Sequence, residues 1–201
     1  DIMMAVEEYP EIQKLNLRES NRSGIPNEIG TLIRLMVIES KGYNVGSLPE
    51  SISNLEKLYT LDIRNSQSVS LPKSIGEMEN LGYIKLYECG LKEIPQEIFS
   101  MERLSYLELT GNDISIIPEE IGKLKRLERF EIDYHPDMTI PESMKNWKEN
   151  NGSHLSVIIY TKTIKETAKA NKLIKGYGES EHSESGEWSV YGPTREYPNL
   201  Y

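Results

Sequence analysis

The sequence predicts an α/β fold in which one short unit repeats and stacks into a right-handed solenoid. Three observations predict it: prolines at a fixed spacing, apolar columns in register with them, and a change of apolar period within each unit. The prolines stand 23 residues apart, and each follows a Leu or an Ile: Pro26, Pro49, Pro72, Pro95, Pro118 and Pro141. A constant period of this length is typical of repeat architectures.

Apolar residues recur at fixed positions after each proline. The third residue is one of Ile29, Ile52, Ile75, Ile98, Ile121 and Met144. The ninth residue is one of Leu35, Leu58, Leu81, Leu104 and Leu127. A pair in alternation then follows: Leu61 with Ile63, Ile84 with Leu86, Leu107 with Leu109 and Phe130 with Ile132. Several columns that share one register indicate a structural unit rather than chance.

Each unit changes its apolar period at its middle. The spacing of three after the proline predicts a short helix or 3₁₀ turn with one buried face. The alternation that follows predicts a short strand with one buried face. Proline suits the start of the helical part, where its missing N–H has no intrahelical partner to lose.

One unit of 23 residues cannot bury its own apolar face, so neighbouring units must stack to cover it. Stacking places the strands in parallel, about 4.8 Å apart, along one curved face. We therefore expect a single parallel sheet with the short helical turns on the other side.

The repeat resembles the leucine-rich repeat, whose pattern is L-x-x-L-x-L-x-x-(N/C)-x-L. Residues 104–114, LSYLELTGNDI, and residues 81–91, LGYIKLYECGL, carry this pattern. The 23-residue form with L-P-x-x-I-G-x-L resembles repeats of Ras-group and bacterial leucine-rich proteins. The resemblance covers roughly residues 2–160. It implies a horseshoe arc, with the parallel sheet on the concave face and short helical or 3₁₀ segments on the convex face, and a role in protein interaction.

The Asn/Cys column departs from the family pattern. The residues in this column are Ser20, Tyr43, Ser66, Cys89, Asn112 and His135. We expect the hydrogen-bonded ladder of this column to be imperfect, worst at Tyr43 and His135. The unit that starts at Pro26 is also irregular, because Ser40 stands where the second strand leucine belongs.

Three segments follow from the pattern. Residues 1–160 form the solenoid, with about seven repeats, of which the first is divergent and lacks its proline. Ile2, Val6 and Tyr9 share one face of a short helix that either caps this end or follows repeats that have been removed. Residues 161–176 predict a capping helix that starts at a capping box, Thr163 to Glu166, after a strand near residues 155–160 that we expect to be the last of the sheet.

Residues 177–201 form an acidic and aromatic tail. Acidic low-complexity sequence favours disorder, but the tail also contains Trp188, Tyr191, Tyr197 and Tyr201. We expect these aromatic residues to pack against the solenoid or against a neighbouring chain.

Composition and motifs exclude several classes of function. The net charge of −9 disfavours binding to nucleic acid or to an anionic membrane. No apolar run approaches the ~18 residues of a membrane span, so no membrane insertion is expected. The chain has no catalytic motif, and its three histidines lack metal-ligand spacing, so we expect no enzyme activity, metal or cofactor. We interpret Cys89 as a buried residue of the Asn/Cys column rather than as a nucleophile. A nucleophilic cysteine would need a base beside it.

The strand positions that alternate with the inward-facing ones predict the binding face. We expect exposed tyrosines ringed by charge to form it, which is the composition of interaction hot spots; the alternative is that tyrosine is there for its strand propensity alone. The candidate residues are Tyr83, Lys85, Tyr87, Tyr106, Glu108, Arg129, Glu131, Asp133 and Tyr134. A second, basic column runs along the first strands: Arg18, Lys41 and Arg64.

The pattern thus predicts a non-catalytic module that binds a protein or peptide on its concave face. We expect the partner to carry a basic or aromatic segment, and the chain's own tail is one candidate. The alternative is the recognition part of a larger bacterial effector, surface protein or receptor. The compartment stays open between a bacterial secreted or surface protein and a cytoplasmic scaffold, as does the oligomeric state.

Overall fold

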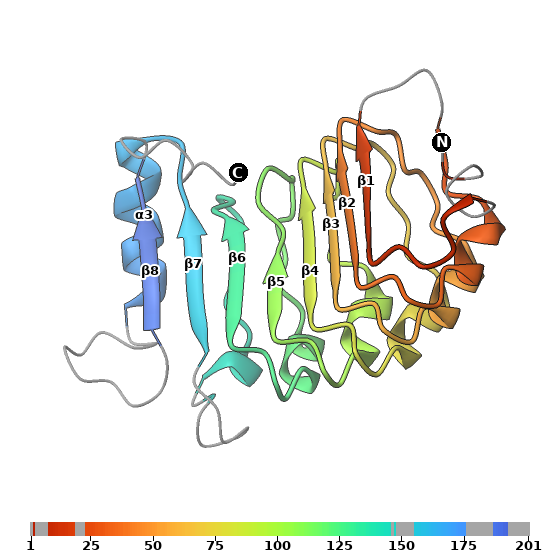
Figure 1. Cartoon of the computed structure of the whole chain (residues 1–201). Coiled ribbons are helices and arrows are strands. Elements are labelled where there is room, and N and C mark those ends of the chain that lie inside the picture. Colours follow the sequence, from red (N-terminus) through yellow and green to blue (C-terminus); the bar gives the residue numbers. More distant parts are fainter. Residues whose placement is uncertain are drawn as a thin grey trace.

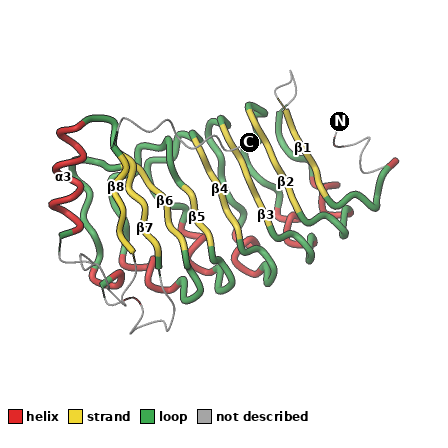
Figure 2. Tube along the Cα trace, turned by 60° about the vertical axis from the view of Figure 1, so that its left-hand side comes forward, coloured by secondary structure: helices red, strands yellow, loops and turns green. Residues whose placement is uncertain are grey.

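The computed structural model describes residues 2, 8–18, 23–145, 147, 155–175 and 187–192. Within them the chain winds through successive turns, each made of one strand and, in most turns, one 3₁₀ helix (Figure 1). The strands form one open sheet in the order β1 to β8, with every neighbouring pair parallel. Figure 2 shows the strands in a single row and the 3₁₀ helices along a separate row. The sequence prediction of a parallel-sheet solenoid is confirmed.

The elements recur at the predicted spacing. The strands are β1 (Lys14–Arg18), β2 (Val37–Lys41), β3 (Thr60–Arg64), β4 (Tyr83–Tyr87), β5 (Tyr106–Glu108), β6 (Arg129–Asp133), β7 (Ser156–Tyr160) and β8 (Glu187–Tyr191). The helices are η1 (Asn27–Thr31), η2 (Glu50–Asn54), η3 (Lys73–Glu77), η4 (Gln96–Ser100), η5 (Glu119–Lys123), η6 (Glu142–Met144) and α3 (Ile164–Ile174).

Each 3₁₀ helix begins directly after its proline. Pro49 lies in extended conformation at φ −73° and ψ 151°, the residue before η2. The N–H of Ile52 then donates to the Pro49 carbonyl at 3.1 Å, and the N–H of Leu55 donates to the Ile52 carbonyl at 3.0 Å. Ile52 is fully buried. The ring of the proline sets φ for this entry, and the spacing of three buries one face of the turn.

The turns stack without offset, so like residues lie beside like. In the sheet, Leu61 pairs with Ile84, and Ile84 pairs with Leu107. All three side chains are fully buried in one continuous apolar core. The helical turns also pack closely, because a Cβ at Gly76 would lie 2.7 Å from the Cβ of Ser100. The glycine after the column isoleucine therefore permits the close approach of neighbouring turns.

Asn112 ties two turns together through its side chain. Its Oδ1 accepts from the N–H of Cys89 at 3.0 Å and from the N–H of Leu91 at 3.1 Å. Its Nδ2 donates to the carbonyls of Leu86 at 2.7 Å and Leu109 at 2.8 Å. One half-buried amide thus satisfies backbone groups of two successive turns, which is the role expected of this column.

The other members of the column bond differently. Ser66 accepts from the N–H of Val45 at 2.8 Å, which keeps one bond between turns. Tyr43 instead donates its hydroxyl to the Gly24 carbonyl at 2.8 Å. His135 accepts from the N–H of Asp137 within its own loop. The ladder is therefore irregular at Tyr43 and His135, as predicted, while Ser20 lies outside the described residues.

The carboxyl-terminal end differs from the prediction in one respect. The predicted strand and helix are present as β7 and α3, and the N–H of Glu166 donates to Thr163 Oγ1 at 3.1 Å in the expected cap. The expectation that β7 ends the sheet is wrong, because β8 pairs with it in parallel over five residues. Helix α3 connects two neighbouring strands, and the eighth strand lies in the stretch predicted as a tail.

The two ends of the chain have the least regular sequence, and the structure describes only part of each. Trp188 and Val190 of β8 pack against the core, so the aromatic tail docks on the solenoid at this point. Tyr197 and Tyr201 lie outside the described residues. At the other end Ile2 is buried, whereas Tyr9 is exposed; Val6 lies outside the described part of the chain.

Candidate protein-binding face

The open face of the sheet is built from strand residues that alternate with buried ones. In β4, Ile84 and Leu86 are buried, whereas Tyr83, Lys85 and Tyr87 are half-buried on the other side. Strand pleating produces this alternation, since successive side chains point to opposite faces. The parallel register then aligns the outward positions of neighbouring strands in rows, with Tyr83 beside Tyr106 and Lys85 beside Glu108.

Three aromatic rings form a tyrosine ladder across this face, made of Tyr59, Tyr83 and Tyr106. The ring centroids of Tyr59 and Tyr83 lie 4.8 Å apart, and those of Tyr83 and Tyr106 lie 5.6 Å apart. Tyr59 is 47% exposed and was not among the predicted site residues. Tyr59 stands one position before the first outward residue of β3, so strand alternation does not assign it to the face. The signal that could have found it is Gly82, one turn later, where a Cβ would lie 3.1 Å from the Tyr59 ring.

Tyr106 is fixed between two cations and a carboxylate. Lys85 Nζ lies 5.0 Å from the centre of its ring, and Arg129 Cζ lies 5.7 Å from it. Its hydroxyl donates to Glu131 Oε1 at 2.7 Å. Burial and the neighbouring carboxylate of Glu108 raise the pKa of Tyr106. The ring is therefore a preorganised, neutral part of the face.

Glu131 is the centre of the polar network below the ladder. Its Oε1 also accepts from Arg129 Nε at 2.7 Å, and its Oε2 accepts from the hydroxyl of Tyr160 at 2.8 Å. The Glu131 side chain is nearly covered. Burial and the hydrogen bond to Glu131 raise the pKa of Tyr160. A carboxylate with this many donors is already satisfied and serves to position the tyrosines.

Glu108 is the most deeply buried carboxyl group of the face, with 1% of the residue exposed. It accepts from the Thr110 hydroxyl at 3.0 Å, and its Oε2 lies 3.7 Å from Lys85 Nζ. Burial raises the pKa of Glu108, and the nearby charge of Lys85 offsets part of that rise. This group cannot be reached by a partner without a change in the face.

The structure brings most of the predicted site residues together. Six of them form one contiguous cluster: Tyr83, Lys85, Tyr106, Glu108, Arg129 and Glu131. The other three lie at the carboxyl ends of the strands. Tyr87 donates to Glu88 at 2.8 Å, Asp133 accepts from the N–H of Gly111 at 2.6 Å, and Tyr134 packs against the core.

The basic column at the amino-terminal end is partly neutralised. Arg18, Lys41 and Arg64 align in register across β1 to β3. Arg64 donates two hydrogen bonds to Asp62, each at 2.7 Å. Arg64 is therefore neutralised, whereas neither Arg18 nor Lys41 forms an ion pair with a described residue.

Three observations on the described residues bear on catalytic, metal and membrane roles. Burial raises the pKa of the Cys89 thiol to about 12, and its Sγ donates to the Ile63 carbonyl at 3.4 Å. No three His, Cys, Asp or Glu residues gather as a metal site within the described part of the chain. None of its helices has the length and apolar character needed to cross a membrane.

Comparisons with known proteins agree with this architecture. The family model described as Leucine Rich Repeat matches residues 103–124, and the search of curated proteins found no match. An LRR protein of Leptospira interrogans superposes with a TM-score of 0.57 at 21% identity, over 78% of this chain and 53% of that one. An internalin, InlF, of Listeria monocytogenes gives 0.52 at 18% identity, over 83% of this chain and 53% of that one.

A plant receptor shows the same likeness in fold. The Arabidopsis receptor kinase HAESA, solved with the peptide hormone IDA and the co-receptor SERK1, gives a TM-score of 0.57 at 23% identity. The match covers 78% of this chain and 28% of that one, so the chain spans about half or less of the length of these three structures. Together with the matched repeat at residues 103–124 and the regular 23-residue turns, these likenesses show that the chain has the fold of a leucine-rich repeat solenoid.

Proposed function

We propose that the chain is a non-catalytic module that binds a protein or peptide across the open face of the sheet, centred on the tyrosine ladder. The observation that carries the proposal is the ladder itself, in which the ring centroids of neighbouring tyrosines lie 4.8 Å and 5.6 Å apart on an otherwise polar face. Aromatic side chains offer a large apolar area at low entropic cost, which suits a binding surface. The leucine-rich repeat is generally a protein-interaction fold, and the HAESA structure is one of its peptide complexes.

The network under the ladder supports a binding role over a purely structural one. Tyrosine on a strand needs no partner for its hydroxyl when it faces water, yet Tyr106 and Tyr160 both donate to Glu131. The bond from Tyr106 holds one ring of the ladder in place before any partner arrives, which reduces the entropy lost on binding. Preorganised rings on an open sheet therefore favour the hot-spot interpretation.

The same network refines the chemistry expected of the partner. An aromatic or apolar segment can lie on the exposed ring of Tyr59 and on the neighbouring ring of Tyr83. A basic segment would need accessible carboxylates, and those of Glu108 and Glu131 are almost covered and already bonded. We therefore propose an extended segment with apolar or aromatic residues as the ligand at this face.

Site-specific photocross-linking tests the proposal. A photoreactive benzoyl-phenylalanine replaces Tyr83 on the open face in one variant and Gln96, on η4, in a matched variant. In an extract of the source organism, we expect a discrete protein or peptide adduct at position 83 and none at position 96. Adducts at position 96 alone, or none at position 83, would contradict the proposed face.

The larger-protein alternative concerns the context of the module rather than its site. The matched structures are longer than this chain, which spans 53%, 53% and 28% of them. We propose that a binding face of this kind also suits the recognition part of a bacterial effector, surface protein or receptor. A flanking catalytic or signalling domain encoded by the full gene is the observation that would favour this context.

A further inference from the structure

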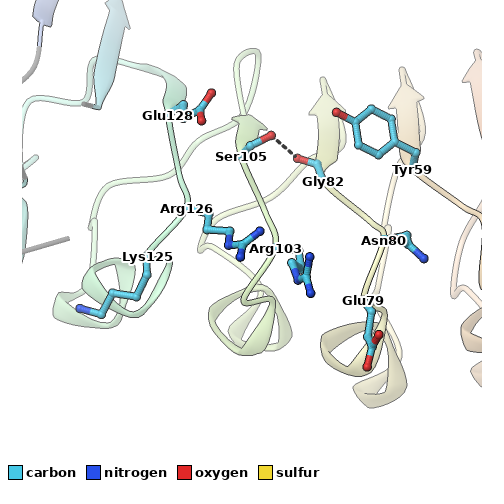
Figure 3. Close-up of a pocket in the computed structure, with 9 residues that line it drawn as sticks. All are labelled: Tyr59, Glu79, Asn80, Gly82, Arg103, Ser105, Lys125, Arg126 and Glu128. Atoms are coloured by element: carbon cyan, nitrogen blue, oxygen red, sulfur yellow. Dashed lines mark hydrogen bonds between the residues drawn. The ribbon is translucent and has the colours of Figure 1, made fainter. Parts of the chain in front are cut away.

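A shallow pocket of about 420 Å³ lies at the rim of the sheet, where the chain enters strands β4, β5 and β6 (Figure 3). Its walls come from equivalent positions of neighbouring turns, since the N–H of Ser105 donates to the Gly82 carbonyl and the N–H of Glu128 donates to the Ser105 carbonyl. The lining residues are Tyr59, Glu79, Asn80, Gly82, Arg103, Ser105, Lys125, Arg126 and Glu128.

Two arginines in this pocket have no counter-ion among the described residues. Arg103 and Arg126 occupy the same position of successive repeats, 23 residues apart, and both line the pocket. Neither guanidinium group makes a hydrogen bond or an ion pair with any residue that the structure describes. By contrast, Arg64 and Arg129 on the sheet are both bonded to carboxylates. Arg103 and Arg126 are therefore available at the rim for an acidic group of a partner.

The charge of the pocket suits one carboxylate. Arg103 and Arg126 bring two guanidinium groups to the pocket, and the carboxylates of Glu79 and Glu128 line the same pocket. A guanidinium group offers a planar fork of donors that matches a carboxylate in a bidentate way. A singly charged carboxylate meets less repulsion from Glu79 and Glu128 than a doubly charged phosphate does.

The pocket adjoins the tyrosine ladder. Tyr59 lines the pocket and also stacks with Tyr83 at 4.8 Å, so one ring belongs to both surfaces. Gly82 leaves space for that ring, because a Cβ there would approach it to 3.1 Å. A segment that lies on the ladder can therefore extend an adjacent side chain into the pocket without leaving the surface.

We propose that this pocket binds an Asp or Glu side chain of the partner segment between Arg103 and Arg126, with Tyr59 as its apolar wall. The inference rests on the proposed function, because it adds an acidic residue to the apolar segment that contacts the ladder. It replaces the basic segment expected from the sequence with an acidic one, since Glu108 and Glu131 are covered and the arginines of the rim are exposed.

Two synthetic peptides test the inference. The probes are a fluorescein-labelled, amidated peptide of four Tyr-Glu repeats and the same peptide with Gln in place of Glu, measured by fluorescence anisotropy. We expect the acidic peptide to bind at least about tenfold more tightly than the amide version, because hydrogen bonds between charged groups are the strong ones. The double variant Arg103→Gln/Arg126→Gln should lose this preference.

A matched variant controls for overall charge. Arg34→Gln/Lys57→Gln removes two positive charges from the equivalent position of earlier repeats and should retain the preference for the acidic peptide. An equal loss in both double variants, equal binding of the two peptides, or displacement of the acidic peptide by an equal concentration of inorganic phosphate would overturn the inference. The affinity of the acidic peptide is also measured in a Tyr83→Ala background. There, an unchanged affinity that still depends on Arg103 and Arg126 would support the pocket but contradict the proposed binding across the ladder.

Discussion

At the scale of single residues, charge on the open face is largely neutralised within the protein. Glu131 accepts from Arg129, Tyr106 and Tyr160, and Asp62 accepts from Arg64. These bonds position the aromatic rings and leave few carboxylates for a partner. The sequence predicted which residues share the face, because strand alternation assigns them. It could not predict that their charges cancel, because that depends on side-chain rotamers across neighbouring turns.

Glu108 provides a pH test of this burial. Because burial raises its folded-state pKa, the contribution of Glu108 to stability is present below its unfolded pKa and is lost as pH rises through the folded value. Glu108→Gln keeps an acceptor for Thr110 but removes the buried charge. We expect this variant to be more stable than wild type at pH 7, with the difference shrinking toward pH 4, in urea unfolding at both pH values.

An exposed position on the same row serves as the control for Glu108. Glu39→Gln removes one carboxylate that pairs with Lys14 near the surface, and it should show a smaller change between the two pH values. A Glu108→Gln variant that is less stable than wild type at pH 7 would contradict the account.

Cys89 provides a second test at this scale. With its pKa raised to about 12, the thiol is almost entirely protonated at pH 8, and the side chain is fully buried. We expect iodoacetamide to modify Cys89 quickly in denaturant and very slowly in the folded protein, as followed by intact mass. Fast modification of the folded protein would indicate a reactive thiol and would support a catalytic role for Cys89.

At the scale of elements, the regular turns were predictable and the last strand was not. Prolines and apolar columns indicate where each 3₁₀ helix and strand begins, because every turn packs the same columns against its neighbours. Strand β8 follows an acidic stretch and lies outside the 23-residue period, so its sequence, EWSVY, carries too little periodicity to distinguish it from a tail. What identifies it is pairing with β7, a contact distant in sequence.

Removal of β8 tests its contribution. A chain that ends at residue 175 loses the core contacts of Trp188 and Val190 and the bond from the Thr161 N–H to the Tyr191 carbonyl. Half-burial of these two side chains suggests a loss of about 2–4 kcal/mol in the free energy of unfolding. Urea unfolding should show this loss against a control chain that ends at residue 192 and keeps β8. Equal stability of the two chains would show that β8 adds nothing to the solenoid.

At the scale of the whole molecule, the fold follows from repetition and the function from what does not repeat. Identical columns of Ile and Leu stack the turns, whereas the outward positions change from turn to turn and carry Tyr83, Lys85, Tyr106 and Arg129. The sequence thus predicted the solenoid and most of the face. It missed Tyr59 and the rim pocket, because both depend on how positions outside the strand alternation meet across turns.

The affinity of the partner cross-linked at position 83 tests the central claim most directly. Isothermal titration would compare wild type with Tyr83→Ala on the open face and with Gln96→Ala on η4. We predict that Tyr83→Ala raises Kd at least about tenfold, as truncation of an aromatic hot spot does, and that Gln96→Ala leaves Kd within about twofold. An unchanged Kd for Tyr83→Ala, together with a loss of binding for Gln96→Ala, would contradict binding on the open face of the sheet.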